Sequence, residues 1–171
     1  MLIYRLRFKG VFMDERYMEE ALKEAQTAAL AGEIPIGAVI VKDDVIVGRG
    51  RNSAEESKDP TCHAEIMAIK DACKNLGAWR LTDCDMYVTL EPCSMCAGAI
   101  VLARIKNLYI GTPDPKAGAC VSLNNITTDP RLNHQVNLNV GLLQEECSKM
   151  LKDFFRELRN RPKKKPEDFG K

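Results

Sequence analysis

Long apolar runs are missing from this sequence of 171 residues. None approaches the roughly 20 apolar residues that a membrane-spanning helix needs, so we expect no membrane segment. The N-terminal stretch MLIYRLRFKGVF lacks both an uninterrupted apolar core and a small-residue cleavage site, which does not fit a signal peptide. We interpret residues 1–12 as a leader or a misassigned start before Met13, and assign them no function.

An excess of charge of either sign is also absent, because 25 Lys and Arg residues face 24 Asp and Glu residues. A contact with nucleic acid would therefore have to come from a local group of charges rather than from the field of the whole chain. The clearest such group is a basic tail at residues 161–171, where Lys163, Lys164 and Lys165 could contact phosphates. The tail follows a single predicted domain at residues 13–160.

Histidine is scarce, with only His63 and His134, and the seven cysteines are odd in number. The chain is long enough, and at 45% hydrophobic residues apolar enough, to form a core without disulfide bonds. We therefore expect a cytoplasmic protein with reduced cysteines. In such proteins most cysteines are small buried hydrophobes, and a few bind metal or act in catalysis.

Hydrophobic periodicity predicts an α/β fold. Helices are expected over residues 14–31, 63–75, 93–103 and 142–159. Strands are expected over residues 36–41, 45–52, 86–90 and 108–111, with a weak last strand near Val140. This order implies one sheet that is covered by helices on both faces.

Three further local features are predicted from the sequence. The polar stretch 53–58 is interpreted as a loop, and Asp59 or Thr61 as the cap of the helix that follows. Residues 112–139 are rich in Pro, Gly, Asn and Asp and should be mostly irregular. The last helix is expected to face the core through one apolar stripe, formed by Leu143, Cys147, Met150, Leu151, Phe154 and Leu158.

Reactive side chains concentrate around Cys93 and Cys96, around His63, and at Asn52. Two thiols at i and i+3 in the first turn of a helix share a face, and the positive end of that helix favours their thiolate form. With His63 they make three ligands, which leaves the fourth tetrahedral position of zinc open to water, as in catalytic sites. Glu65 can stand beside that water and transfer protons if the metal lies off the end of the helix.

Each element also has another interpretation. C-x-x-C at the start of a helix is the redox motif of thioredoxin-like proteins. A closed structural zinc site is possible as well, with Cys62, Cys84 or Cys120 as fourth ligand. Taken alone, C-x-x-C leaves these alternatives open. The combination H-x-E and P-C-x-x-C is far more specific, because it is the signature of zinc-dependent nucleobase deaminases.

From about residue 14 to residue 159 the sequence resembles the bacterial tRNA adenosine deaminases, within the cytidine/deoxycytidylate deaminase superfamily. The resemblance is carried by PIGAVIV (35–41), GRN (50–52), DPTCHAEIMAI (59–69), YVTLEPCSMCAGAI (87–100) and DPKAGA (114–119). It departs from the family at Cys62, where alanine is usual, and so places a further thiol near the site. The resemblance implies a three-layer α/β/α fold with a central mixed five-stranded sheet.

The resemblance also implies the reaction, which is hydrolytic deamination of adenosine to inosine at the first anticodon base of tRNA. One Zn²⁺ per chain would be bound by His63, Cys93 and Cys96, with Glu65 as proton shuttle. The partner would be a tRNA anticodon stem-loop, and the chain would form a homodimer. Substrate contacts are implied for Asn52, Ala64, Asp114, Asn133 and His134.

Two other functions compete with this one. A small-molecule deaminase of the same fold, acting on guanine, cytosine or a related base, would need the same ligands and the same glutamate. The loop at residues 114–119 and the basic tail favour RNA over a free base. A structural zinc protein or RNA-binding module, by contrast, would have no need of Glu65.

Overall fold

The computed structural model describes residues 15–160 of the chain. The predicted leader at residues 1–12 and the basic tail at residues 161–171 lie outside these described residues. Within them, no helix combines the length and the apolar character needed to cross a membrane.

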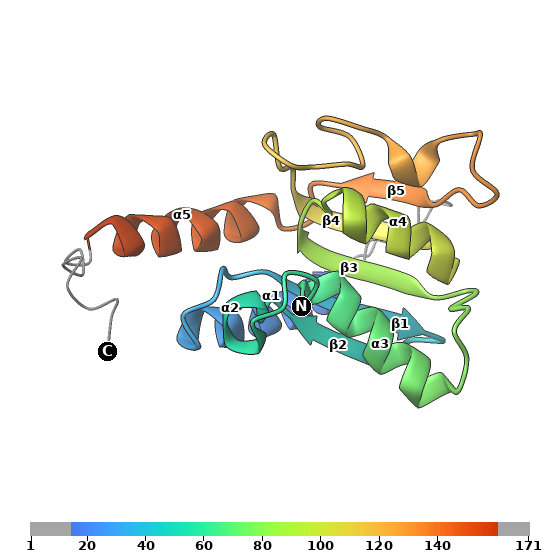
Figure 1. Ribbon diagram of the computed structural model, residues 1–171, viewed down its shortest axis with the longest axis horizontal. Coiled ribbons are helices and arrows are strands. Elements are labelled where there is room, and N and C mark those ends of the chain that lie inside the picture. Colours follow the sequence, from blue (N-terminus) through green and yellow to red (C-terminus); the bar gives the residue numbers. More distant parts are fainter. Residues whose placement is uncertain (1–14, 161–171) are drawn as a thin grey trace, which may run out of the picture.

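A mixed sheet of five strands, in the order β2-β1-β3-β4-β5, forms the centre of the fold (Figure 1). β1 runs antiparallel to both of its neighbours, and β3, β4 and β5 are parallel to one another. The carboxyl ends of β2, β3, β4 and β5 therefore lie at the same edge of the sheet. The strands span Gly37–Lys42 (β1), Val45–Arg51 (β2), Asp85–Leu90 (β3), Asn107–Thr112 (β4) and Asn137–Val140 (β5).

Helices cover both faces of the sheet, so the predicted three-layer α/β/α architecture is confirmed (Figure 1). Side chains of a strand alternate between its two faces. In β1, Val39 and Val41 accordingly pack with α1 (Glu15–Leu30) and the start of α5 (Gln144–Asn160). Ala38 and Ile40 belong to the larger core, with α3 (Ala64–Leu76) and α4 (Ser94–Ala103).

α3 approaches β2 unusually closely, because both surfaces carry very small side chains. Gly48 and Gly50 of β2 face a row of buried alanines on α3, namely Ala64, Ala68 and Ala72. A Cβ atom added at Gly50 would overlap the backbone of Ala64 and Ala68. This contact fixes where the first turn of α3 lies relative to the carboxyl end of β2.

The entry to α3 differs from the prediction in two ways. The expected loop at residues 53–58 contains a short helix, α2 (Ala54–Ser57), which is too short to leave a periodic pattern. Asp59 and Thr61 do not cap α3, because Asp59 Oδ1 accepts hydrogen bonds from the backbone N–H and the hydroxyl of Thr61, at 2.8 and 2.7 Å. They form a local turn of their own, and the N-cap of α3 is His63.

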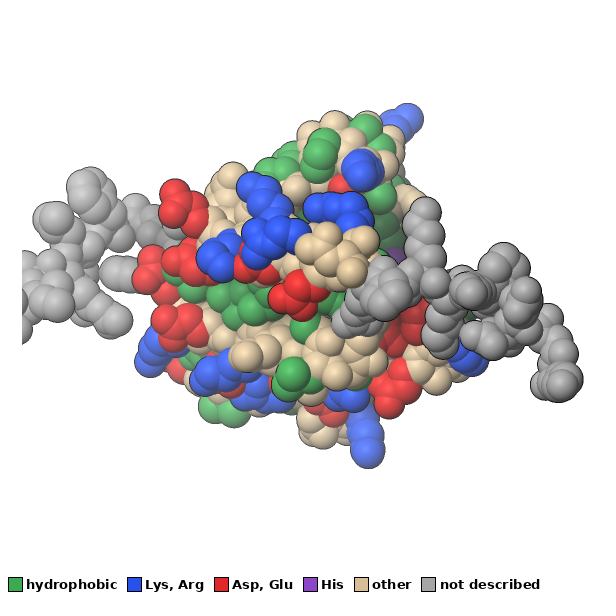
Figure 2. Space-filling model, turned by 90° about the vertical axis from the view of Figure 1, so that its left-hand side faces the viewer, with side chains coloured by type: hydrophobic (Ala, Val, Ile, Leu, Met, Phe, Trp, Pro, Cys, Tyr) green, Lys and Arg blue, Asp and Glu red, His purple; other side chains and the backbone are tan. Residues whose placement is uncertain are grey.

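The prediction that the apolar stripe of α5 faces the core is confirmed at Cys147 and is wrong at the end of the helix. Cys147 is buried beside β4, whereas Leu158 is 46% exposed. A helix of 17 residues is about 25 Å long, and a six-residue strand such as β4 spans only about 20 Å. α5 therefore projects past the edge of the sheet (Figure 1), and hydrophobic side chains surface among charged ones on that side (Figure 2).

The segment at residues 112–139 is mostly irregular, as predicted. It contains one turn of 3₁₀ helix at Ile126–Thr128. The weak last strand that was expected near Val140 is β5, which begins three residues earlier, at Asn137. Its half-exposed residues and its position at the edge of the sheet explain why its pattern is weak.

The tight contact between α3 and β2 predicts the effect of one added methyl group. Gly50→Ala should lower the free energy of unfolding by about 1–3 kcal/mol, since a rigid backbone must move to accept the new Cβ. Urea denaturation monitored by circular dichroism measures this change. Gly98→Ala is the matched control, because nothing lies within 4 Å of its added Cβ. Equal stability of the two variants would contradict the packing described above.

Candidate active site and metal centre

Two helices begin at the same edge of the sheet, and the side chain at each N-cap position forms no capping hydrogen bond. His63 is the N-cap of α3 and Cys93 is the N-cap of α4, both with extended backbone conformation and without a side-chain hydrogen bond to the helix. Serine, threonine, aspartate or asparagine at such a position stabilises a helix by about 1 kcal/mol. His63 and Cys93 do not provide this stabilisation, so both side chains are available to bind a metal ion.

The predicted ligand set converges in the structure. The Nδ1 atom of His63 lies 3.6 Å from the sulfur of Cys93 and 3.6 Å from the sulfur of Cys96. Zinc bonded to nitrogen and sulfur at tetrahedral angles would hold those atoms about 3.5 Å apart. These two distances therefore fit a tetrahedral metal ion such as zinc, and the three donor atoms all lie within 4.8 Å of one another.

No fourth ligand completes this group. Between residues 15 and 160, the only set of three or more His, Cys, Asp or Glu ligand atoms close enough to share an ion is His63, Cys93 and Cys96. Cys62, Cys84 and Cys120 are buried elsewhere and do not join it. This arrangement argues against a closed structural site, and an imidazole placed against both sulfurs argues against a simple redox pair.

The two thiols differ in acidity. A hydrogen bond from the Cys96 thiol, together with the nearby imidazole of His63, lowers the pKa of Cys93 to about 5. The pKa of Cys96 is raised, because it shares that hydrogen bond with Cys93 and because it is buried. Cys93 is thus a thiolate at neutral pH, and a metal ion would displace the remaining proton from Cys96.

Glu65 lies in the first turn of α3 and is only 4% exposed. Burial, with a smaller contribution from the negative charge of Cys93, raises the pKa of Glu65 to about 7. A carboxyl group with this pKa can both accept and release a proton at neutral pH, which general acid–base catalysis requires.

Three of the predicted substrate contacts lie at the edge of the sheet that carries the ligands. Asn52 directly follows β2 and is 6% exposed, and Ala64 is the first residue of α3. Asp114 follows β4, where a loop of residues 114–122 begins. The topology therefore brings these residues to the same end of the fold as His63, Cys93 and Cys96.

Asn133 and His134 lie elsewhere. The guanidinium of Arg104, which follows the carboxyl end of α4, donates to the backbone oxygen of Asn133 at 2.8 Å. His134 Nε2 donates to the backbone oxygen of Ile105 at 2.6 Å. Cys93 and Cys96 are at the opposite end of α4, so the structure does not bring Asn133 and His134 to the metal group.

Two buried glutamates near the site were missed by the sequence reasoning. Glu33 accepts hydrogen bonds from the side-chain amide of Asn52, at 3.1 Å, and from the backbone N–H of Glu56, at 2.7 Å. Because a carboxylate only accepts, it holds the NH₂ group of Asn52 toward itself. Glu91 binds the loop that follows β4. Its one sequence signal is its place two residues before a metal ligand.

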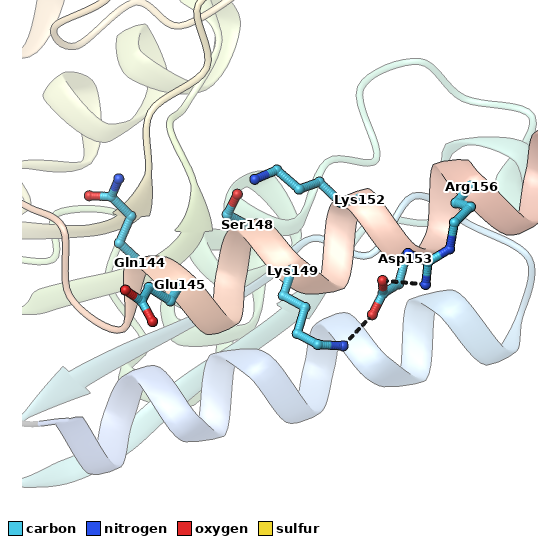
Figure 3. Close-up of a pocket in the computed structure, with 7 residues that line it drawn as sticks. All are labelled: Gln144, Glu145, Ser148, Lys149, Lys152, Asp153 and Arg156. Atoms are coloured by element: carbon cyan, nitrogen blue, oxygen red, sulfur yellow. Dashed lines mark hydrogen bonds and ion pairs between the residues drawn. The ribbon is translucent and has the colours of Figure 1, made fainter.

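A shallow hollow along α5 is a weaker candidate for a site (Figure 3). Asp153 pairs there with Lys149 and Arg156, all of them on the same helix. The walls contain no buried polar group, so nothing selects a ligand. The side chains that line it are Gln144, Glu145, Ser148, Lys149, Lys152, Asp153 and Arg156.

Comparisons with known proteins agree with this geometry. The family model of MafB19-like deaminases matches residues 12–159. The tRNA-specific adenosine deaminase of Bacillus subtilis is 49% identical over 150 residues, which cover 88% of this chain and 93% of that protein. A solved structure from work on A-to-I editing by tRNA:A34 deaminases has a TM-score of 0.78 and 45% identity, and covers 81% of this chain and 100% of that one.

A guanine deaminase structure from Bacillus subtilis is also similar, with a TM-score of 0.58, 36% identity and coverage of 90% and 98% of the two chains. The motifs indicated a resemblance to tRNA adenosine deaminases. It is confirmed, because those relatives have a higher identity and TM-score than the guanine deaminase structure. Since the family model spans nearly all of the described residues, this chain belongs to the MafB19-like deaminase family.

Proposed function

We propose that this protein is a zinc-dependent enzyme that deaminates adenosine to inosine at the wobble position of tRNA. The observation that carries the proposal is the open three-ligand group of His63, Cys93 and Cys96 with the buried carboxyl group of Glu65 on the same helix as His63. A structural zinc site would have no use for an acid of this kind or for an open fourth position.

The donor set suits zinc in its chemistry as well as in its distances, because thiolate and imidazole are the ligands that zinc prefers. When bound, zinc lowers the pKa of a coordinated water molecule to about 7 and so supplies hydroxide at neutral pH. His63, Cys93 and Cys96 would hold the ion, one ion per chain.

Glu65 performs the proton transfers in this proposal. Its carboxylate accepts a proton from the water that attacks C6 of adenine and donates that proton to N1. It then takes the second proton of that water from the new hydroxyl group at C6 and donates it to the amino group at C6, which leaves as ammonia. Burial favours the neutral form of Glu65 enough for both directions of transfer at one pH.

The substrate contacts are assigned to residues at the same edge of the sheet. Glu33 fixes the amide of Asn52, whose oxygen and remaining N–H then form a donor and acceptor pair for the base. Ala64 and Asp114 would line the place of the nucleoside, which must be turned out of its stack to reach the site. Contacts by Asn133 and His134 would require RNA that extends along α4.

A guanine-specific deaminase remains the competing function, because that chemistry needs the same metal ligands and the same acid. The tRNA-specific relatives are more similar to this chain in both sequence and structure than the guanine deaminase structure is. This difference in similarity supports tRNA as the substrate.

We further propose a cytoplasmic homodimer. Met95 and Leu102 lie seven residues apart and hence on one face of α4, and Leu102 is 70% exposed. Large apolar side chains that share an exposed face are typical of interaction surfaces. A second copy of the chain is the partner that the family resemblance implies, and the cytoplasm is where tRNA is modified.

Removal of one ligand should empty the metal site. Cys93→Ser and Cys96→Ser should each lose most of the one zinc per chain that we expect in the wild type, because two donors do not hold zinc tightly. Elemental analysis by mass spectrometry of the purified proteins measures the content. Cys73→Ser is the control and should keep its zinc, since Cys73 lies in the later half of α3. Unchanged zinc in both ligand variants would refute the assignment.

Replacement of the proton carrier should separate binding from catalysis. Glu65→Gln should keep the fold and the zinc, yet lower the turnover number about 100-fold or more, because an amide cannot accept the proton. Steady-state release of ammonia at saturating substrate provides the measurement. Glu146→Gln, an exposed position on α5, is the matched control. If Glu65→Gln retains more than about a tenth of the wild-type rate, the role given to this residue is wrong.

The substrate is tested by direct competition. At matched concentration and salt, an anticodon stem-loop with adenosine at the wobble position should release ammonia faster than free adenosine, cytidine or guanine. A stem-loop with the adenosine moved by one position controls for unspecific binding of RNA. The small-molecule alternative would replace this proposal if guanine or cytidine reacted faster than the stem-loop.

A further inference from the structure

Glu91 is a buried carboxylate, 2% exposed, that neither the metal group nor the proton transfers use. It lies between the end of β3 and the metal-ligand segment that starts at Cys93. Its Oε1 atom accepts from three backbone N–H groups in succession, those of Cys120 at 3.1 Å, Val121 at 2.8 Å and Ser122 at 2.9 Å. An ionised carboxylate offers about four acceptor sites on its two oxygens, and these three bonds engage one oxygen alone.

The other oxygen reaches the opposite end of the same loop. Oε2 accepts from the backbone N–H of Asp114 at 2.9 Å and from the hydroxyl of Ser122. Every donor to Glu91 therefore belongs to the 114–122 loop, and the carboxylate closes that loop by holding its first and last residues together. The loop contains no helix or strand of its own that could do so.

The loop is attached to the ligand segment by its backbone as well. The N–H of Ala119 donates to the oxygen of Pro92 at 2.9 Å, and Gly118 forms a β-bridge with Cys93. A Cβ atom at Gly118 would overlap the carboxyl group of Glu91, so only glycine leaves room for it. The loop that begins at Asp114 is thus held by the side chain of Glu91 and by backbone contacts with Pro92 and Cys93.

We propose that Glu91 is a positioning residue that fixes Asp114 relative to the metal ligands and thereby determines how tightly the substrate binds. This proposal rests on the proposed function, because that function gives Asp114 its role at the nucleoside. A merely structural glutamate would affect the stability of the whole domain. A positioning glutamate affects the 114–122 loop and the KM for RNA while the metal group stays intact.

The substitution Glu91→Gln should affect the hydrogen bonds at the two ends of the loop differently. The amide oxygen can replace Oε1 and keep the three N–H groups of residues 120–122, and the hydroxyl of Ser122 can turn to accept from the new NH₂ group. The backbone N–H of Asp114 then faces a donor and loses its acceptor. The variant therefore releases one end of the loop alone.

In wild-type protein loaded with zinc, we expect the amides of Asp114, Cys120, Val121 and Ser122 to exchange slowly with solvent, although they lie in a loop. In Glu91→Gln, exchange at Asp114 should accelerate about tenfold or more and exchange at residues 120–122 far less. The KM for the stem-loop should rise by a similar factor, with a smaller change in kcat and with one zinc still bound. Nuclear magnetic resonance and steady-state kinetics measure these quantities.

Ser122→Ala is the matched control, because it removes one donor and leaves all four backbone N–H bonds to Glu91; its exchange at Asp114 and its KM should stay near the wild-type values. Fast exchange of all four amides in the wild type would overturn the proposal without any variant. Unchanged exchange at Asp114 in Glu91→Gln, or loss of zinc and of protection throughout the domain, would overturn it too. Failure of the wild type to deaminate the stem-loop would instead refute the proposed function, and the exchange data would still decide what Glu91 holds.

Discussion

The site depends on the meeting of two helix N-termini at one edge of the sheet. β3 and β4 are parallel neighbours, and the backbone turns from β2 and from β3 into helices that both start at this edge. His63 and Cys93 occupy the two N-cap positions, next to the free N–H groups of the first turns, although neither side chain forms a capping hydrogen bond. The same N–H groups favour negative charge, so thiolate ligands are stabilised before any metal arrives.

This geometry requires that α3 lie close to the sheet. The glycines of β2 and the alanines of α3 allow that close approach. If Gly50 carried a side chain, α3 would move outward and take His63 away from the sulfurs of α4. The sequence motif H-x-E therefore acts only in combination with the glycines of β2, which are distant in sequence from the ligands. The H-x-E motif and the close packing of α3 on β2 are both needed to place His63 near the two sulfurs.

The candidate metal group was predictable because the combination of H-x-E with P-C-x-x-C is a specific signature, and each of its two parts is local: Cys93 and Cys96 lie one turn apart, and Glu65 lies two residues from His63. The central strands and most helices were predictable from periodicity for the same reason. The face that α5 buries was not, since periodicity identifies an apolar stripe but not the partner that covers it. The role of Glu91 also depends on a loop some thirty residues away, which no pattern around Glu91 encodes.

Three buried glutamates surround the site, and their hydrogen-bond donors separate their roles. Burial raises the pKa of Glu91, but donors in the 114–122 loop outweigh that effect and hold its pKa below the usual value. Glu33 is engaged by Asn52 and by a backbone N–H. Glu65 has too few donors to offset burial, and its pKa rises to about 7. A carboxylate saturated with donors is a fixed anchor, because protonation would break the bonds that hold it. The glutamate left short of donors can both accept and release a proton near neutral pH, which is what the role proposed for Glu65 requires.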